Sequence, residues 1–120
     1  MKQGRPKIDY RFQDVIDKAL EYTSEITGVK TQDIQCKCKK ATFVRARFIY
    51  EYVMMETTPL TMEEIGRNIY RDHATVWSGY CRAKELFALN KEFLMQALTV
   101  QDMLEEYIDN RENILNFKTL

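Results

Sequence analysis

The segment Arg71-Asp72-His73-Ala74-Thr75-Val76 has the composition of a helix start, and it is the most informative part of the sequence. The Asp72 carboxylate can accept hydrogen bonds from backbone amides two or three residues later, and its charge suits the positive end of a helix dipole. The small and polar residues that follow then lie on the first turn of the helix, where a partner can reach them. A helix end of this kind fits the major groove of DNA.

A second helix start lies shortly before this one. In Thr61-Met62-Glu63-Glu64, the threonine and the last glutamate are spaced to exchange side-chain hydrogen bonds with each other's backbone amides. Ile65-Gly66 follows, and only a few residues separate this short helix from the helix that begins at Asp72. Two helices joined this closely predict a helix-turn-helix.

The composition predicts one globular and mostly helical domain. A chain of 120 residues with 45 % hydrophobic and 12 % aromatic residues can bury a core without disulfides or metals. Two prolines and four glycines leave little room for tight turns, so long helices are expected. No apolar run is long enough to cross a bilayer, and the first residues do not form a secretion signal, so a cytoplasmic location is the default expectation.

The residues that usually carry chemistry do not form a catalytic or metal site in this sequence. Cys36, Cys38 and Cys81 lack the usual zinc spacing, and a single histidine, His73, cannot build a histidine-based metal site. We therefore expect reduced thiols, no bound metal and no cofactor. No serine or cysteine near the histidine suggests a catalytic triad and no phosphate-binding loop is present, so an enzyme is not expected.

Charge is distributed unevenly, although the formal net charge is zero. Residues 1–50 carry eleven Lys and Arg against six Asp and Glu, whereas residues 85–120 carry three against seven. Five basic residues and no acidic one lie between Asp33 and Glu51, namely Lys37, Lys39, Lys40, Arg45 and Arg47. Such a local patch attracts a polyanion even when the total charge is zero.

Hydrophobic spacing divides this single domain into an arm, a bundle and an extension. Residues 1–8 are expected to be a flexible arm, either a frayed terminus or, through Gly4-Arg5-Pro6, a minor-groove contact. Residues 9–89 hold the bundle, with a helix ended by Gly28, a short turn from Thr31, an apolar central helix over 43–55 and the helix-turn-helix. Residues 90–120 are expected to form an acidic helical extension that closes the core or pairs with a second copy.

The order of these features resembles the C-terminal DNA-binding domain of the bacterial replication initiator DnaA. The similar elements run from about Val15 to Leu86 and comprise Thr31-x-Asp33-Ile34, the basic run, Val44-Arg45-Ala46-Arg47, Leu60 to Gly66, Arg71 to Val76, and Lys84. The resemblance implies an all-α helix-turn-helix bundle of about five to six helices, related to the Trp-repressor fold, that recognises a short asymmetric DNA duplex. It also implies that Arg45 reaches the minor groove, and that Asp72, His73, Ala74 and Thr75 meet base edges or phosphates in the major groove.

The chain departs from the family pattern at several positions. Ala74 and Ser78 stand where the family commonly has threonine and histidine, and Ile69-Tyr70 replaces a Gly-Gly pair before Arg71. Where the family has a segment similar to Arg-Pro-Arg-Gln, this chain has Arg45-Ala46-Arg47-Phe48. DNA binding survives such changes more readily than a particular target sequence does. The initiator's ATPase module has no counterpart in these residues, so origin melting is not implied.

These observations together predict a non-enzymatic protein that binds double-stranded DNA, in replication or in regulation. Base reading is expected from Arg45, Asp72, His73, Ala74, Thr75 and Ser78. Phosphate binding is expected from Lys37, Lys39, Lys40, Arg47, Thr61 and Arg71. The alternative is a helical interaction module that has lost DNA binding and uses its acidic C-terminal helix to bind a protein partner or a second copy.

Overall fold

The computed structural model describes residues 10–119, which form a short 3-10 turn followed by six α-helices. The elements are η1 (Tyr10–Phe12), α1 (Gln13–Thr27), α2 (Thr31–Gln35), α3 (Ala41–Thr57), α4 (Met62–Arg67), α5 (His73–Leu89) and α6 (Lys91–Thr119). Strands are absent from this range, so the expectation of an all-α helix-turn-helix bundle is confirmed. The arm predicted over residues 1–8 lies outside the described residues.

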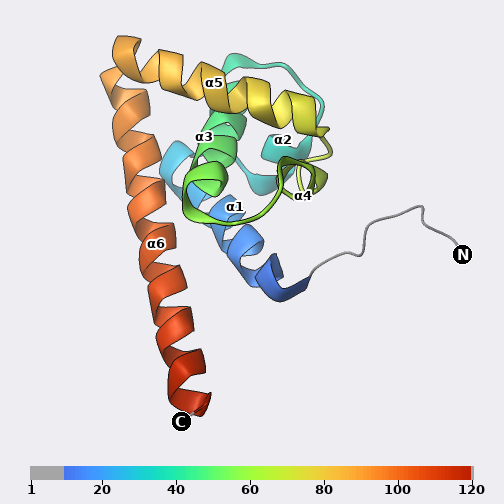
Figure 1. Ribbon diagram of the computed structural model, residues 1–120. Helices are drawn as coiled ribbons and strands as arrows, with labels where there is room; N and C mark the ends of the chain where they lie inside the picture. Colours follow the sequence, from blue (N-terminus) through green and yellow to red (C-terminus); the bar gives the residue numbers. More distant parts are fainter. Residues whose placement is uncertain (1–9, 120) are drawn as a thin grey trace, which may run out of the picture.

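The central helix is α3, and α1, α5 and α6 pack around it (Figure 1). It is apolar on nearly all sides, as a helix must be when neighbours surround it. Its fully buried side chains include Ala46, Ile49, Tyr50, Val53 and Met54. The hydroxyl of Tyr50 donates a hydrogen bond to the carbonyl oxygen of Ile65 at 2.9 Å, which ties α3 to α4. The central helix α3 therefore supports the helix-turn-helix through its contact with α4.

Two of the predicted helix ends are formed as expected. Gly28 follows α1 with a φ of 76°, a left-handed conformation in which glycine avoids the clash of a Cβ atom. At the start of α4, the amide of Glu64 donates to Oγ1 of Thr61 at 3.1 Å, and the amide of Thr61 donates to Oε1 of Glu64 at 3.0 Å. This reciprocal pair begins α4 at a defined residue.

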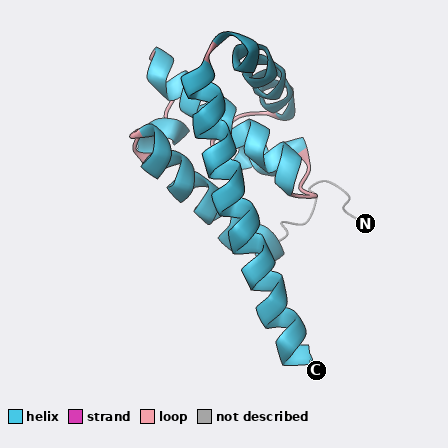
Figure 2. Cartoon of the chain, turned by 90° about the vertical axis from the view of Figure 1, so that its left-hand side faces the viewer, coloured by secondary structure: helices cyan, strands magenta, loops and turns pink. Residues whose placement is uncertain are grey.

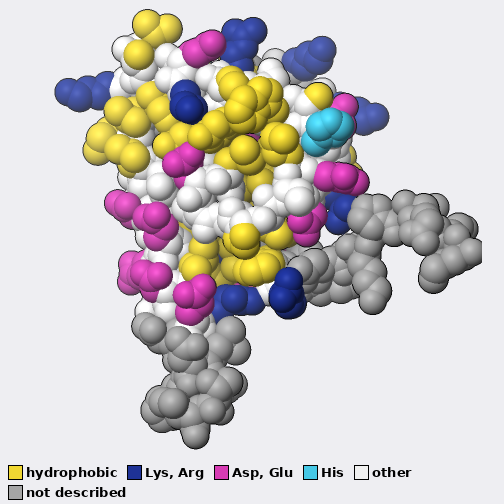
Figure 3. Space-filling view, viewed as in Figure 1, with side chains coloured by type: hydrophobic (Ala, Val, Ile, Leu, Met, Phe, Trp, Pro, Cys, Tyr) yellow, Lys and Arg dark blue, Asp and Glu magenta, His cyan; other side chains and the backbone are white. Residues whose placement is uncertain are grey.

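The last helix, α6, runs from the end of α5 along one side of the bundle and past α1 (Figures 1 and 2). Its buried stripe comprises Phe93, Ala97, Val100 and Leu104. Further along, Asp14 of α1 accepts hydrogen bonds from the hydroxyl of Tyr107 at 2.7 Å and from Nε of Arg111 at 2.8 Å. The acidic side chains of α6 face outward (Figure 3). The predicted extension therefore packs onto the same core as the bundle.

None of the described helices is both long enough and apolar enough to span a lipid bilayer. The three cysteines are free thiols. Within the described residues, no group of three His, Cys, Asp or Glu side chains is arranged so that it could hold a metal ion.

Candidate DNA-binding surface

The helix-turn-helix consists of α4, the connection over residues 68–72, and α5. Its two helices approach each other at Gly66, whose carbonyl oxygen accepts a hydrogen bond from the amide of Arg71 at 2.9 Å. A Cβ atom at this position would lie 2.9 Å from Cγ2 of Val76 and would collide with the carbonyl oxygen of Arg71. Because glycine has no side chain, it permits this approach, and the short connection depends on it.

Asp72 begins α5 as the sequence predicts. Its Oδ1 accepts a hydrogen bond from the amide of Thr75 at 2.8 Å, and this contact lowers the pKa of the carboxyl group. The expected base-reading side chains of α5 are all exposed, namely Asp72, His73, Ala74, Thr75 and Ser78. The histidine lies at the outer end of α5 (cyan in Figure 3). The opposite face of α5 is buried through Val76, Gly79 and Ala83, so the helix is anchored while its first turns remain free.

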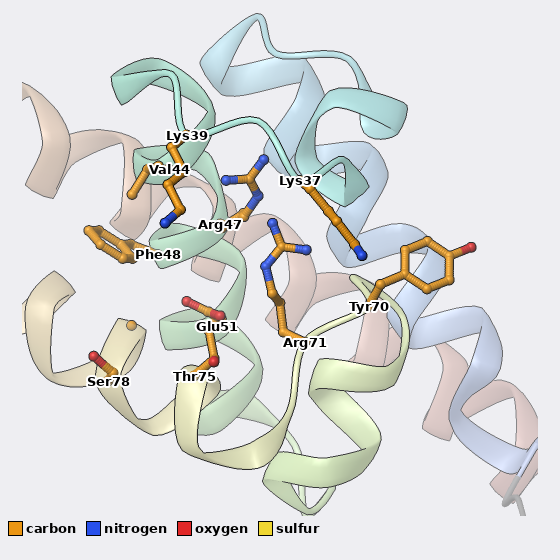
Figure 4. Close-up of a pocket in the computed structure, with 11 residues that line it drawn as sticks. Lys37, Lys39, Val44, Arg47, Phe48, Glu51, Tyr70, Arg71, Thr75 and Ser78 are labelled. Atoms are coloured by element: carbon orange, nitrogen blue, oxygen red, sulfur yellow. The ribbon is translucent and has the colours of Figure 1, made fainter.

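A groove of about 500 Å³ lies between α5, α3 and the basic segment over residues 36–40 (Figure 4). Its lining residues are Lys37, Lys39, Val44, Arg47, Phe48, Glu51, Tyr70, Arg71, Thr75, Ser78 and Gly79. The tertiary structure thus places two lysines of the basic segment and two exposed polar residues of α5 in the lining of one groove. We call this feature the α3–α5 groove.

The basic segment presents its lysines to solvent. Lys37, Lys39 and Lys40 are all exposed, and the first two line the α3–α5 groove. The amine of Lys40 lies over the ring of Phe43, with Nζ 5.3 Å from the ring centroid. All three amines are therefore accessible to a polyanion that lies on this side of the molecule.

Arg47 has a different role from the phosphate contact that the sequence predicts. Its side chain is 5 % exposed, and its guanidinium donates hydrogen bonds to three backbone carbonyl oxygens. These belong to Ile34 at 2.7 Å, Asp33 at 3.0 Å and Cys36 at 2.7 Å. Burial and the neighbouring Arg71 lower the pKa of Arg47. The phosphate assignment is corrected because this guanidinium is occupied in holding the end of α2 and the following residue against α3.

Arg71 is half-buried and has both internal contacts and access to the groove. Its Nη1 donates to the carbonyl oxygen of Ile69 at 2.8 Å, and its Nη2 donates to that of Cys36 at 2.7 Å. Six of the predicted site residues lie outside the groove lining, namely Lys40, Arg45, Thr61, Asp72, His73 and Ala74. Arg45 is exposed near the start of α3, and Thr61 is exposed at the start of α4, where its hydroxyl takes part in the reciprocal pair with Glu64.

Glu51 provides a buried carboxylate in the lining of the α3–α5 groove and was not among the site residues predicted from the sequence. Its side chain is 2 % exposed, and none of the described residues donates a hydrogen bond to it. Burial raises its pKa to about 8, while Arg71 and Arg47 act in the opposite direction. A Cβ atom on Gly79 would collide with this carboxylate, so α5 packs directly on it. The sequence feature that could have identified Glu51 is the presence of a charged residue inside the apolar run over residues 43–55.

The α3–α5 groove and the helix-turn-helix belong to the part of the chain that matches a known family. The bacterial dnaA protein helix-turn-helix family matches residues 16–82, which is more than half of the chain. This stretch includes the basic segment, the reciprocal pair that begins α4, the connection at Gly66 and the first turns of α5, while α6 lies beyond it. The helix-turn-helix domain of this family binds DNA and is not catalytic. This chain belongs to the bacterial DnaA helix-turn-helix family.

Proposed function

We propose that this protein recognises a specific sequence in double-stranded DNA. The first turns of α5 enter the major groove, and the basic segment binds the adjacent phosphates. The observation that carries the proposal is the shared lining of the α3–α5 groove, to which α5 contributes Thr75 and Ser78 and the basic segment contributes Lys37 and Lys39. An α-helix fits the width of the major groove, and cations at its side match the phosphates that border that groove.

Base reading is assigned to the exposed tip of α5. The ring nitrogens of His73 and the hydroxyl groups of Thr75 and Ser78 can bond to base edges, and the methyl group of Ala74 can contact a thymine methyl group. Oδ1 of Asp72 caps the helix, which leaves the other carboxylate oxygen for a cytosine amino group. The tip therefore offers both hydrogen-bonding and apolar contacts.

Phosphate binding is assigned to the cations beside this tip. Lys37, Lys39 and Lys40 are exposed, and Arg71 lines the groove with part of its guanidinium free of the two internal hydrogen bonds. The hydroxyl of Thr61 is a further phosphate contact at the start of α4, and Arg45 is assigned to the minor groove. With about four phosphates neutralised, the logarithm of affinity should fall with the logarithm of salt concentration at a slope of about −3 to −4.

The test begins with selection of a preferred duplex from a random pool, followed by titration in a salt series. We expect His73→Ala to lose preference for the selected duplex over a scrambled one while it keeps the salt slope. Lys39→Ala should weaken binding to both duplexes equally and reduce the slope by about one. Lys91→Ala, an exposed lysine at the start of α6, is the matched control and should change neither quantity. A slope near zero with no preferred duplex would reject the proposal.

A protein-interaction module is the second candidate, and one observation favours it. Leu89, Met95 and Leu98 are 83 %, 56 % and 40 % exposed where α5 meets α6. Exposed apolar side chains on a helical corner are typical of surfaces that associate. In that case Met95→Ser would abolish self-association in analytical ultracentrifugation, and the wild-type protein would show no salt-dependent binding to duplex DNA.

A further inference from the structure

Tyr70 has a backbone conformation that tyrosine rarely adopts. Its φ is 57°, and among the described residues it is the one non-glycine residue with a positive φ. In this left-handed region the Cβ atom of an L-residue crowds its own backbone, which raises the free energy of the folded state. Glycine adopts the same conformation without that crowding. The tyrosine at this position therefore needs an explanation.

The connection between α4 and α5 accounts for the backbone conformation but not for the tyrosine. The amides of Ile69 and Arg71 both donate to the carbonyl oxygen of Gly66, at 3.0 and 2.9 Å. Ile69 is fully buried, whereas Arg71 lines the α3–α5 groove, so the chain must turn sharply between them. A glycine at position 70 would allow the same turn with less strain.

The side chain of Tyr70 has no polar or aromatic partner among the described residues. It is 70 % exposed, and no described residue forms a hydrogen bond or a ring contact with it. The ring stands at the edge of the α3–α5 groove with Lys37 and Thr75 in the same lining (Figure 4). A large aromatic side chain held out at the edge of a cationic groove is in a position to contact what binds there.

We propose that Tyr70 contacts the DNA backbone, with its ring packed on a deoxyribose and its hydroxyl donating a hydrogen bond to a phosphate. This inference rests on the DNA binding proposed above. Lys37 and Arg71 line the same groove and would hold the phosphates on the strand that crosses it, which brings a sugar to the ring. Because sugar and phosphate carry no base identity, this contact adds affinity without adding sequence preference.

The test compares the wild-type protein with Tyr70→Gly and Tyr70→Phe on the selected duplex and on a scrambled duplex of equal length. Tyr70→Gly should lower affinity for both duplexes by roughly tenfold, because the ring contact is lost. Its Tm should be unchanged or higher, because glycine relieves the left-handed strain. Tyr70→Phe should lose roughly threefold, through the hydroxyl alone. Leu89→Ala is the matched control, because Leu89 is an even more exposed apolar side chain at the far end of α5, and it should leave both affinities unchanged.

The outcomes separate this inference from the function on which it rests. If the wild-type protein binds DNA and Tyr70→Gly binds both duplexes as tightly, the role of Tyr70 is wrong and the proposed function stands. The role is also wrong if affinity falls only together with Tm, because the tyrosine would then act through stability. If the wild-type protein binds no duplex, the proposed function fails and this inference fails with it.

Discussion

Arg47 and Arg71 both donate a hydrogen bond to the carbonyl oxygen of Cys36, each at 2.7 Å. Arg47 comes from α3, whereas Arg71 lies 35 residues after Cys36, immediately before the residue that caps α5. The shared oxygen stands where the basic segment begins. One backbone atom therefore joins α3, the basic segment and the helix-turn-helix, and it sets the spacing between the lysines and the tip of α5.

Arg47→Lys tests the internal role of this arginine. Lysine keeps the charge, but its amine cannot donate to three carbonyl oxygens with the planar geometry of a guanidinium group. We expect a loss of about 2–3 kcal/mol in the free energy of unfolding, measured by urea denaturation, together with weaker binding to duplex DNA because the lysines lose their position. Arg45→Lys, on the exposed side of the same helix, should change stability by less than about 0.5 kcal/mol. Equal stability of the two variants would contradict the internal role of Arg47.

Glu51→Gln tests the buried carboxylate through the pH dependence of stability. Burial raises the pKa of Glu51 to about 8 from an ordinary value of 4.5. The folded state therefore holds this proton more tightly than the unfolded state, and the free energy of unfolding falls as pH rises between those values. The full difference between these two pKa values corresponds to a change of at most about 5 kcal/mol in the free energy of unfolding.

Glutamine has nearly the same shape and does not ionise, so the decline caused by Glu51 should disappear in Glu51→Gln. The variant should gain stability relative to the wild-type protein as pH rises from 5 to 8, as measured by urea denaturation at a series of pH values. Stability profiles that run parallel over this range would show that Glu51 does not titrate as described.

Gly79→Ala tests the close packing of α5 on Glu51. The added methyl group would collide with the carboxylate, so we expect a loss of about 1–3 kcal/mol in stability although alanine is the better helix former. In a Glu51→Ala background the same substitution should be neutral or stabilising, because the colliding group has been removed. A double-mutant cycle with no coupling energy would disprove this packing.

Tyr107→Phe tests the attachment of α6 to α1. The variant loses the hydrogen bond from the Tyr107 hydroxyl to Asp14, and we expect a loss of about 1 kcal/mol in the free energy of unfolding. Tyr22→Phe is the matched control, because Tyr22 is also half-buried and its hydroxyl has no hydrogen-bond partner among the described residues. A larger loss in the control than in Tyr107→Phe would rule out this attachment.

Features that depend on neighbours along the chain follow from the amino-acid order alone. The caps at Gly28, Thr61 and Asp72 were predictable because each is formed by atoms within four residues of one another. The apolar character of α3 likewise predicted a central helix. The ordered combination of these local signals was enough to indicate the family.

Which charged side chains face the surface depends instead on how the helices pack together. Arg45 and Arg47 are two residues apart, so they point about 200° from each other around α3, and their sequence does not say which one faces outward. The positions of Glu51 beneath α5 and of Tyr70 at the groove edge likewise depend on how α4 and α5 pack against α3. These properties arise from contacts between residues far apart in the chain, and such contacts exist only after the helices have been brought together.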